Sequence, residues 1–395
     1  MFRQFSRRRF LKQGAASVLC ASALPLSSRA KSNDVGKLKT DVPAKELIAD
    51  LSKLIPQLMS KHRVPGLSIA VIRDAEIMWS QGFGVKSVVT REPVNPDTVF
   101  EAASLSKPAF AYPVLKMCEK GKLGLDTPLT EYLPTPFIPD EPRMQLITAR
   151  LILSHSSGLP HGRPAGVPNA LRFTPGKQFY YSATGYQYLQ NVVERLSNQP
   201  LSDFMKINLL EPFGMQSSSF GWIDRYDKQA AQGHDKDGNP GLSGNGQYLK
   251  HTAEQRVEFE RDFPEYKYPT SSAGLYTTAS DYAKFMIEII RPSNKDLFRL
   301  SDAITDDMLK PQIKITESIS WGLGWGIEQA DVGDAFWHWG DWGVFRNFAV
   351  AFRKQKIGVV ILTNSFNGPK VYREIVPKAI GGNHPAFAWV NSYRP

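Results

Sequence analysis

Residues 66–84, GLSIAVIRDAEIMWSQGFG, carry the pattern from which the fold can be read. Two apolar runs, rich in Ile, Val, Trp and Phe, are joined by a short polar turn around Asp74. Apolar runs of this length on either side of a tight turn are typical of a β-hairpin. We therefore predict that a hairpin opens the fold, directly after a segment with helical spacing, AKELIADLSKLIPQLMSKHR at residues 44–63.

The other end of the chain shows the same strand-forming pattern. Three successive stretches predict strands, and a fourth has the spacing of a helix: GLGWGIE (322–328), VFRNFAVAF (344–352), KIGVVILTN (356–364) and KVYREIVPKAI (370–380). Between the two ends the chain has mostly short helical patterns and Pro/Gly-rich loops. We predict an α/β fold of the α+β type, with an antiparallel sheet built from both chain termini, flanked by helices, and a mostly helical subdomain inserted at about residues 130–275.

The composition is that of an ordinary globular protein. Of the 395 residues, 42% are hydrophobic and 22% are charged, and this length allows a large core within one domain. The formal net charge is +10, but six of the Lys and Arg residues lie in the first thirty positions, which hold no Asp or Glu. The remaining basic residues are interspersed with acids, so nucleic acid is not expected as a partner.

The basic start of the chain has the pattern of a targeting segment. SRRRFLK (6–12) precedes a short apolar run and then small residues that end at Ala30. The paired arginines resemble the twin-arginine export signal, which a translocation receptor reads and which is not an anchor. We expect residues 1–30 to be this signal peptide, the twin-arginine machinery to be a partner, and the mature protein to be periplasmic or extracellular, without stable membrane insertion.

Two alternatives exist for this segment, a stray basic cluster and an uncleaved anchor. The apolar run is short for a helix that crosses a bilayer, and Pro25 interrupts it. The export signal is therefore the favoured interpretation.

The stretch EAASLSKPAF (101–110) places a serine three residues before a lysine. On a helix these positions share a face, so Ser104 and Lys107 would point into the same space. Pro108 lacks an N–H and is tolerated only in the first turn, which predicts a helix that begins near Ser104. A serine there is a candidate nucleophile, because burial lowers the pKa of a neighbouring lysine and makes it a base. Taken alone, the pattern more often means an N-capping serine beside a solvated lysine.

Two later stretches change that interpretation. TPGKQFYYSATGYQYL (174–189) puts Tyr181 and Ser182 at the start of another helix, and FWHWGDWGVFRNFAVAF (336–352) puts His338 on a strand that leads into a turn. With SLSK, and in this order, they resemble the three active-site elements of the serine β-lactamase and penicillin-binding-protein superfamily. The resemblance is greatest to its class C β-lactamase and esterase branch, which includes D-alanyl-D-alanine carboxypeptidases. It extends through VPGLSIAV, GKLGLDTPLTEYLP, ITARLILSHSSGLP, SSAGLYTTASDYAKF and WGLGWGI.

The resemblance implies a β-lactamase/transpeptidase-like fold and a covalent acyl-enzyme. In this family pattern Ser104 would be the acylated nucleophile and Lys107 the base that takes its proton. Tyr181 would pass that proton to the leaving group and later activate water. Without the resemblance, Tyr181 would be interpreted as a core aromatic residue.

The third element of the pattern implies substrate contacts. His338 stands where many relatives carry a lysine, and Gly340 would let the strand approach the substrate closely. The backbone N–H groups of Ser104 and Asp341 match the oxyanion hole of the family. Without the resemblance, His338 would be interpreted as a packed strand histidine.

One position departs from the family pattern. Relatives have Tyr-x-Asn, whereas Tyr181 is followed here by Ser182 and Ala183. Alanine cannot donate the hydrogen bond with which the asparagine holds a substrate amide, and losing such a bond costs about 1 to 3 kcal/mol. Efficient cleavage of β-lactams or peptides is therefore not expected, which favours an esterase-like acyl hydrolase.

Residues 31–395 are thus expected to form a single β-lactamase-related catalytic domain. Its substrate would be a small-molecule ester or amide, cleaved by an esterase, D-Ala-D-Ala carboxypeptidase or weak β-lactamase. The alternative is a catalytically degenerate, penicillin-binding-like binding protein.

No cofactor and no metal is expected. HDKDGNPG (234–241) begins like a calcium loop, but Pro240 stands at the required glycine. His155 and His161 lack the clustered partners of a zinc site. We expect His155 to brace a loop beneath the cleft.

Overall fold

The predicted hairpin is the first part of the sheet. In the computed structural model, β1 (Gly66–Arg73) and β2 (Glu76–Gly84) form an antiparallel pair. Asp74 and Ala75 between them have positive φ angles of 55° and 58°, the backbone conformation of a two-residue type I′ turn. This turn matches the twist of the two strands, and it confirms the sequence prediction.

The structure describes residues 37–133, 137–162, 170–250, 252, 254–257, 268–293 and 296–393, without the side chain of Tyr248. The predicted signal peptide, residues 1–30, lies outside this part of the chain. The described elements belong to one unit, Val35–Pro395. None of the described helices is both long enough and apolar enough to cross a membrane.

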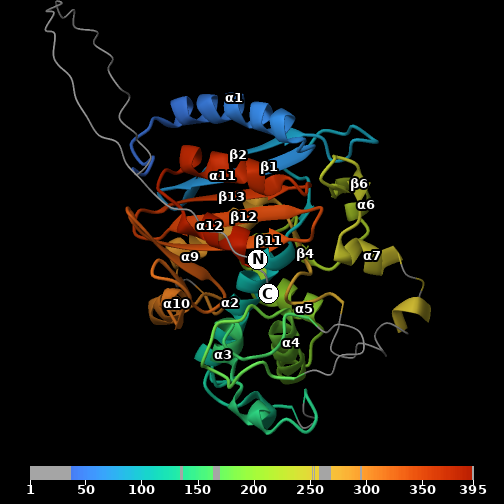
Figure 1. The fold of residues 1–395 in the computed structure, drawn as a ribbon, viewed down its shortest axis with the longest axis vertical. Coiled ribbons are helices and arrows are strands. Elements are labelled where there is room, and N and C mark those ends of the chain that lie inside the picture. Colours follow the sequence, from blue (N-terminus) through green and yellow to red (C-terminus); the bar gives the residue numbers. More distant parts are fainter. Residues whose placement is uncertain are drawn as a thin grey trace, which may run out of the picture. The chain divides into compact units, whose positions relative to one another are not determined.

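Both ends of the chain contribute to an eight-stranded sheet, whose order is β2-β1-β13-β12-β11-β10-β9-β8 (Figure 1). Its neighbouring strands are antiparallel, and β1 pairs directly with β13, so a strand from the start of the chain lies beside one from its end. This arrangement confirms the predicted fold class. The C-terminal strands are β8 (Ile313–Lys314), β9 (Ile319–Trp321), β10 (Gly326–Ala330), β11 (Gly333–Asp341), β12 (Arg346–Phe352) and β13 (Ile357–Thr363).

The sequence prediction was wrong for the first half of the stretch 322–328. Only Gly326 onward forms β10, because the preceding residues close a turn. The Gly322 N–H donates to the Trp325 carbonyl at 2.8 Å, and Gly324 has a φ of 96°. The edge strand β8 and its neighbour β9 were not predicted, since runs of two and three residues are too short to show an alternating pattern.

Alternate residues of the central strands face two different hydrophobic cores. In β13 the odd-numbered residues pack into one core, and Val360 and Leu362 pack into the other. Helices α1 (Ala44–His62) and α11 (Gly368–Ala379) cover the first face, and α9 (Ala279–Ile290) covers the second (Figure 1). Because both faces are buried, KIGVVILTN is a continuous apolar run rather than an alternating one.

The middle of the chain consists mainly of short helices around one buried helix, α2 (Ser106–Glu119). Almost every residue of α2 is buried, as in a helix at the centre of a core. The last helix of the chain is α12 (Pro385–Ser392). The other elements are β3 (Phe100–Glu101), η1 (Ala103–Leu105), η2 (Leu129–Glu131), η3 (Pro142–Leu146), α3 (Ala149–Leu153), α4 (Ala183–Ser197), α5 (Leu201–Met205), η4 (Lys206–Leu210), β4 (Ser219–Phe220), α6 (Tyr226–Gln229), β5 (Gly233–His234), β6 (Pro240–Gly241), α7 (Gly244–Lys250), β7 (Leu275–Thr277) and α10 (Asp302–Leu309).

Candidate active site

Ser104 lies in the tight turn between β3 and α2. The chain leaves β3 at Glu101 and passes through Ala103, whose φ of 51° is a left-handed conformation that strains a residue with a Cβ. Ser106 holds this turn, because its Oγ donates to the Ala103 carbonyl at 2.6 Å and accepts from the Leu275 N–H at 2.9 Å. The strained turn therefore sets the direction in which the Ser104 side chain points.

Lys107 contacts Ser104 from the first turn of α2. Its Nζ lies 3.1 Å from Ser104 Oγ and donates to the Ser272 carbonyl at 3.0 Å. The side chain is only 1% exposed, and burial lowers its pKa to about 7. Near neutral pH much of the amine is therefore uncharged, with a lone pair for the proton of the Ser104 hydroxyl. This burial excludes the alternative of a solvated lysine beside a capping serine.

Tyr181 packs against the same lysine. Lys107 Nζ lies 4.8 Å from the centroid of the Tyr181 ring and 5.5 Å from that of Tyr186. Burial raises the pKa of Tyr181 well above its ordinary value, and the nearby Ser104 hydroxyl offsets only part of this rise. The Tyr181 hydroxyl makes no hydrogen bond of standard geometry with the described residues. Tyr181 is thus a neutral phenol that can give a proton, whereas Lys107 can accept one.

The loop 155–161 holds the backbone around Tyr181. Three N–H groups donate to it: Tyr180 to the His155 carbonyl at 2.7 Å, Ser182 to His155 Nδ1 at 3.0 Å, and Ala183 to the His161 carbonyl at 3.2 Å. Because Nδ1 accepts, the proton of the neutral His155 ring is on Nε2, and burial keeps the pKa of His155 well below its ordinary value. His155 braces a loop, as the sequence predicted.

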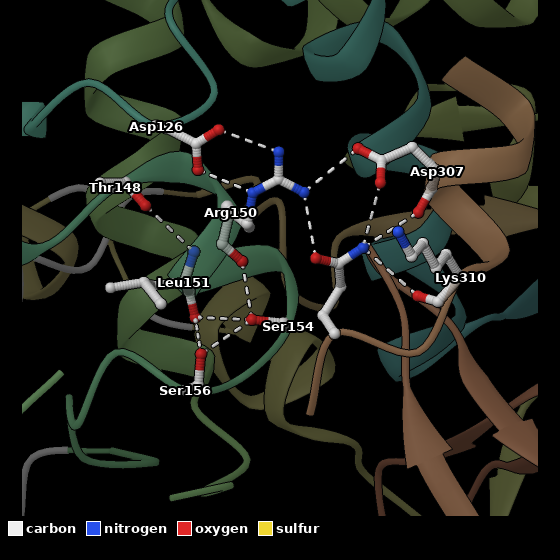
Figure 2. A network of polar contacts seen from close by, with 9 residues as sticks. Asp126, Thr148, Arg150, Leu151, Ser154, Ser156, Asp307 and Lys310 are labelled. Atoms are coloured by element: carbon white, nitrogen blue, oxygen red, sulfur yellow. Dashed lines mark hydrogen bonds and ion pairs between the residues drawn. The ribbon is translucent and has the colours of Figure 1, made fainter. Parts of the chain in front are cut away.

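The helix before this loop is anchored by Arg150 (Figure 2). Its guanidinium donates two hydrogen bonds to Asp126, at 2.7 and 2.9 Å, and reaches across to Asp307 at 3.1 Å and to Gln312 at 3.0 Å. The pair with Asp126 is bidentate, which makes it directional as well as attractive. Arg150 therefore ties α3 to α10, next to the turn at which His155 has a φ of 55°.

His338 lies on β11 and is fully buried. Its Nδ1 donates to the Trp339 carbonyl at 2.7 Å, and its Nε2 makes no hydrogen bond with the described residues. Burial, together with the charge of Lys107, lowers the pKa of His338 to about 3. The neutral ring cannot supply the positive charge of the lysine that many relatives carry here, and a substrate-binding role for His338 stays a prediction.

Gly340 brings β11 against the turn that carries Ser104. A Cβ at this position would lie 2.2 Å from the carbonyl oxygen of Ala102, so a residue other than glycine would push the two segments apart. β11 can therefore lie this close to the turn that carries Ser104 only because residue 340 is a glycine.

The N–H of Asp341 points away from β12. Across the turn that joins the two strands, the Trp342 N–H donates to the Phe345 carbonyl at 3.0 Å. Hydrogen-bonded and non-bonded pairs alternate in an antiparallel ladder, so the next pair, Asp341 with Arg346, is a non-bonded one. The Asp341 N–H therefore takes no part in the ladder between β11 and β12, and the N–H of Ser104 lies in a first helical turn, where N–H groups lack helix partners. The oxyanion hole that the resemblance implies stays a prediction.

A cavity of about 380 Å³ opens beside Ser104. Of the residues predicted from the sequence, Ser104, Tyr181, Gly340 and Asp341 line it. Ala183, the half-buried first residue of α4, and the buried His338 and Lys107 are not part of the lining. Sequence reasoning missed the other lining residues, which are His161, Trp339, Arg346, Pro369, Tyr372, Arg373, Val390, Asn391 and Tyr393.

Two of the missed residues give the cavity a positive charge. Arg346 Nε donates to Asp341 Oδ1 at 3.0 Å, so this guanidinium is paired. Arg373 Nη2 lies 3.5 Å from the neutral amide oxygen of Asn391. With two guanidinium groups and one carboxylate, the lining favours an anionic ligand. No local pattern marks these residues, because Arg346 at the start of β12 and Arg373 on α11 meet at the cavity only through tertiary packing.

Known proteins resemble this chain in sequence and in fold. Residues 51–378 match the beta-lactamase family. The chain is 28% identical to esterase EstB of Burkholderia gladioli over 321 residues, which are 71% of this chain and 80% of that protein. It is 22% identical to protein flp of Staphylococcus aureus (strain N315) over 362 residues, 87% of this chain and 68% of that protein.

Two solved structures share the fold. The octameric penicillin-binding protein homologue from Pyrococcus abyssi has a TM-score of 0.68 at 24% identity, over 83% of this chain and 76% of that one. The D-alanine carboxypeptidase AmpC from Burkholderia cenocepacia has a TM-score of 0.69 at 19% identity, over 85% of this chain and 99% of that one. These likenesses confirm the predicted β-lactamase-like architecture.

Proposed function

The chain belongs to the beta-lactamase family, and on that premise we propose that it is an exported serine hydrolase that cleaves an ester or amide through a covalent acyl-enzyme. The observation that carries the proposal is the pair formed by Ser104 and the buried Lys107, 3.1 Å apart. A solvated lysine would be a cation at neutral pH, whereas burial makes this one a base. The similarity to an esterase supports hydrolysis of esters.

In acylation, Lys107 takes the proton of Ser104 while Oγ attacks the carbonyl carbon of the substrate. A C–O bond forms, and the electron pair of the carbonyl π bond moves to its oxygen, which the N–H groups of Ser104 and Asp341 stabilise. When this intermediate collapses, the bond to the leaving group breaks. The Tyr181 hydroxyl protonates the departing atom and is reprotonated from Lys107.

Deacylation repeats these steps with water as the nucleophile. The family pattern implies that Tyr181 activates this water, but burial keeps its phenol protonated, so we assign the step to Lys107. The water gives a proton to Lys107 as its oxygen attacks the acyl carbon, and the bond to Ser104 Oγ then breaks. The proton returns to Oγ, and the product leaves as a carboxylic acid.

The alternative is a protein with the same fold that binds a ligand but does not hydrolyse it. A binder has no use for a base buried beside a serine, which favours the enzyme. We expect a serine-reactive fluorophosphonate to label the wild-type protein on Ser104 and not to label Ser104→Ala. If the wild-type protein takes no label and hydrolyses neither simple esters, a chromogenic cephalosporin nor a D-Ala-D-Ala peptide, the binding protein is the correct interpretation.

The pH dependence follows from Lys107. A base with a pKa of about 7 is protonated and inactive below that pH, so kcat/KM should fall by about tenfold per pH unit below 7 and level off above it. Burial also raises the pKa of the Glu101 carboxyl to about 7. Burial moves the pKa of the other groups around Lys107 away from neutrality, downwards for His155, His161 and His338 and upwards for Tyr181 and Tyr186.

The matched control for this pH profile is Glu101→Gln, which removes the second group with a pKa near neutrality. We expect its acidic limb to keep the same midpoint. A flat wild-type profile between pH 5 and 8, or a limb that disappears in Glu101→Gln, would contradict the assignment of Lys107 as the base.

Arg373 is expected to select substrates whose leaving group carries a carboxylate, because it lines the same cavity as Tyr181, the proposed proton donor to that group. A hydrogen bond between charged partners contributes about 1.5–3 kcal/mol. Arg373→Ala should therefore lower kcat/KM by at least about tenfold for an ester of a hydroxy acid and leave a matched neutral ester within about twofold. Lys370→Ala is the control, since this exposed residue of the same helix does not line the cavity. Equal losses for both esters would refute the selectivity.

Ala183 is expected to set the preference for esters over amides. The wild-type protein should hydrolyse activated esters and cleave β-lactams slowly, because the hydrogen bond that the family asparagine gives to a substrate amide is missing. Ala183 does not itself line the cavity, so the prediction is that the longer Asn side chain reaches it. Ala183→Asn should then raise the ratio of cephalosporin to ester kcat/KM by about tenfold, the effect of roughly 1.4 kcal/mol. An unchanged ratio, or fast β-lactam hydrolysis by the wild-type protein, would show that this position does not determine the substrate class.

The proposal that the protein is exported rests on the pattern SRRRFLK and the short apolar run that follows it. We propose that the twin-arginine route delivers the protein and that cleavage occurs near Ala30. N-terminal sequencing of the protein isolated from the cell envelope tests this, and an intact first segment there would refute it.

A further inference from the structure

The last segment of the chain lies beyond the family match but forms part of the cavity. The match ends at residue 378, whereas Val390, Asn391 and Tyr393 line the cavity beside Ser104. Residues 381–393 are called the C-terminal tail below. The tail contributes contacts to the site that the family pattern does not predict.

A buried hydrogen-bonded pair, Glu328 and His384, fixes the start of the tail to the sheet. The side chains of Glu328 on β10 and His384 are both fully buried, and His384 Nδ1 donates to Glu328 Oε1 at 2.7 Å. Glu328 Oε2 accepts the Ala386 N–H at 3.0 Å, and His384 Nε2 lies 3.0 Å from the Gly381 carbonyl. Both ring nitrogens therefore lie within hydrogen-bond distance of an oxygen acceptor. Because this pair is fully hydrogen-bonded, it defines where α12 begins.

Aromatic packing also fixes the position of the end of the tail. The Trp389 ring contacts Trp339, which lines the cavity, with a centroid distance of 5.7 Å. The Tyr393 ring stacks on Trp389 at 4.6 Å with an interplanar angle of 19°. The Tyr393 hydroxyl is therefore placed by contacts that extend from β11 through α12.

Tyr393 binds the backbone of the proposed catalytic tyrosine. The Tyr181 N–H donates to Tyr393 Oη at 2.9 Å. The N–H groups of Tyr180, Ser182 and Ala183 all donate to the loop 155–161, so within this segment the Tyr181 N–H is the one held by the tail. Since the Tyr181 hydroxyl makes no standard hydrogen bond with the described residues, its position depends on ring packing and on this backbone anchor.

We propose that the C-terminal tail forms part of the active site and has two roles there. Tyr393 is a positioning residue for Tyr181, and Val390 bounds the space for the leaving group. The catalytic part of this inference rests on the proposed hydrolase function. Proton transfer requires Tyr181 to lie within hydrogen-bond reach of the leaving atom, and small displacements of such a group slow the reaction strongly.

The test is Tyr393→Phe, which removes the hydroxyl and keeps the ring that stacks on Trp389. We expect kcat for a small neutral ester to fall by about fivefold to tenfold, with KM and the melting temperature unchanged. Hydrogen exchange should accelerate at the Tyr181 amide and not at the amides of Tyr180 and Ser182, which keep their bonds to His155. The exchange measurement needs no turnover, so it tests the anchor even if the hydrolase proposal fails.

The matched control is Ser392→Ala. Its Oγ donates only within α12, to the Ala388 and Trp389 carbonyls, and it does not line the cavity. We expect wild-type kcat and wild-type exchange at Tyr181. If the wild-type protein is labelled on Ser104 and Tyr393→Phe keeps the wild-type kcat, the positioning role of Tyr393 is overturned. The hydrolase proposal is not affected by that outcome. An equal loss of kcat in Ser392→Ala would also overturn the positioning role, because the effect would then be a general loosening of the tail.

The boundary role has a separate readout in Val390→Ala, which keeps the tail and enlarges the cavity. We expect kcat/KM for an ester with a bulky leaving group to rise severalfold relative to a methyl ester, because a pocket distinguishes substrates that differ by one methylene. An unchanged ratio would overturn the boundary role.

Discussion

Replacing Lys107 with methionine is expected to lower kcat by at least about 10³-fold, and Ser104→Ala to lower it as much or more. The reason is that the proposed nucleophile and its proposed base lie 3.1 Å apart and would act as one unit. The double variant should be no slower than the worse single variant, since losses within one catalytic unit are not additive. Ester hydrolysis under saturating substrate measures all three values.

Methionine is chosen because it fills the space of the lysine without a buried amine. The variant should therefore keep the wild-type melting temperature, so that the loss of activity reports on chemistry rather than on folding. Near-normal labelling of Ser104 by fluorophosphonate, in which Oγ bonds to phosphorus and fluoride leaves, would in Lys107→Met remove Lys107 from the mechanism. Additive losses in the double variant would show that the two residues act independently.

Gly340→Ala is expected to have the second largest effect. The added Cβ would meet the Ala102 carbonyl oxygen at 2.2 Å, and this backbone atom cannot rotate away. Either β11 or the turn that carries Ser104 must move, which changes the spacing between Ser104 and the Asp341 N–H. A misplacement of about 1 Å costs about 10²-fold in rate, and overpacking of this kind costs about 1 to 3 kcal/mol of stability.

The control is Gly162→Ala, in the loop next to His161, where an added Cβ meets no atom within 4 Å. We expect this variant to keep wild-type kcat and melting temperature. The two variants are compared by kcat and by thermal unfolding. A Gly340→Ala protein with wild-type kcat would show that the close approach of β11 is not needed for catalysis.

Sequence reasoning succeeded where the signal is local. The hairpin at residues 66–84 was predictable because its apolar runs and polar turn lie within one short window, and helix α1 was predictable from its spacing. Pro108 correctly predicted a helix start, since α2 begins at Ser106, directly after η1. The same approach misassigned Gly322–Trp325. These residues form a turn closed by one hydrogen bond, from the Gly322 N–H to the Trp325 carbonyl, but in sequence they look like the start of a strand because they continue into an apolar run.

For the candidate site, sequence and structure contribute different things. The spacing of Ser104 and Lys107 predicted that they share a helix face, and the order of the motifs predicted that Tyr181, Gly340 and Asp341 belong to the same site. The structure places Ser104, Tyr181, Gly340 and Asp341 on one cavity. It keeps His338 buried and neutral, which the motif alone did not indicate.

By itself, then, the sequence determined the strands at both chain ends and the helix that follows Ser104, because these follow from periodicity and turn chemistry. The candidate nucleophile and its base came from the ordered set of motifs and its resemblance to a known family, since the spacing of Ser104 and Lys107 alone more often means a capping serine. Only the tertiary structure decided that Lys107 has a pKa near neutrality, since that depends on how completely distant segments exclude water from its amine. It also decided that Arg373 and Tyr393 reach the cavity. Their places are set by the packing of α11 against β12 and β13 and of α12 against β10 and β11. Contacts between segments so far apart leave no pattern in a local stretch of sequence.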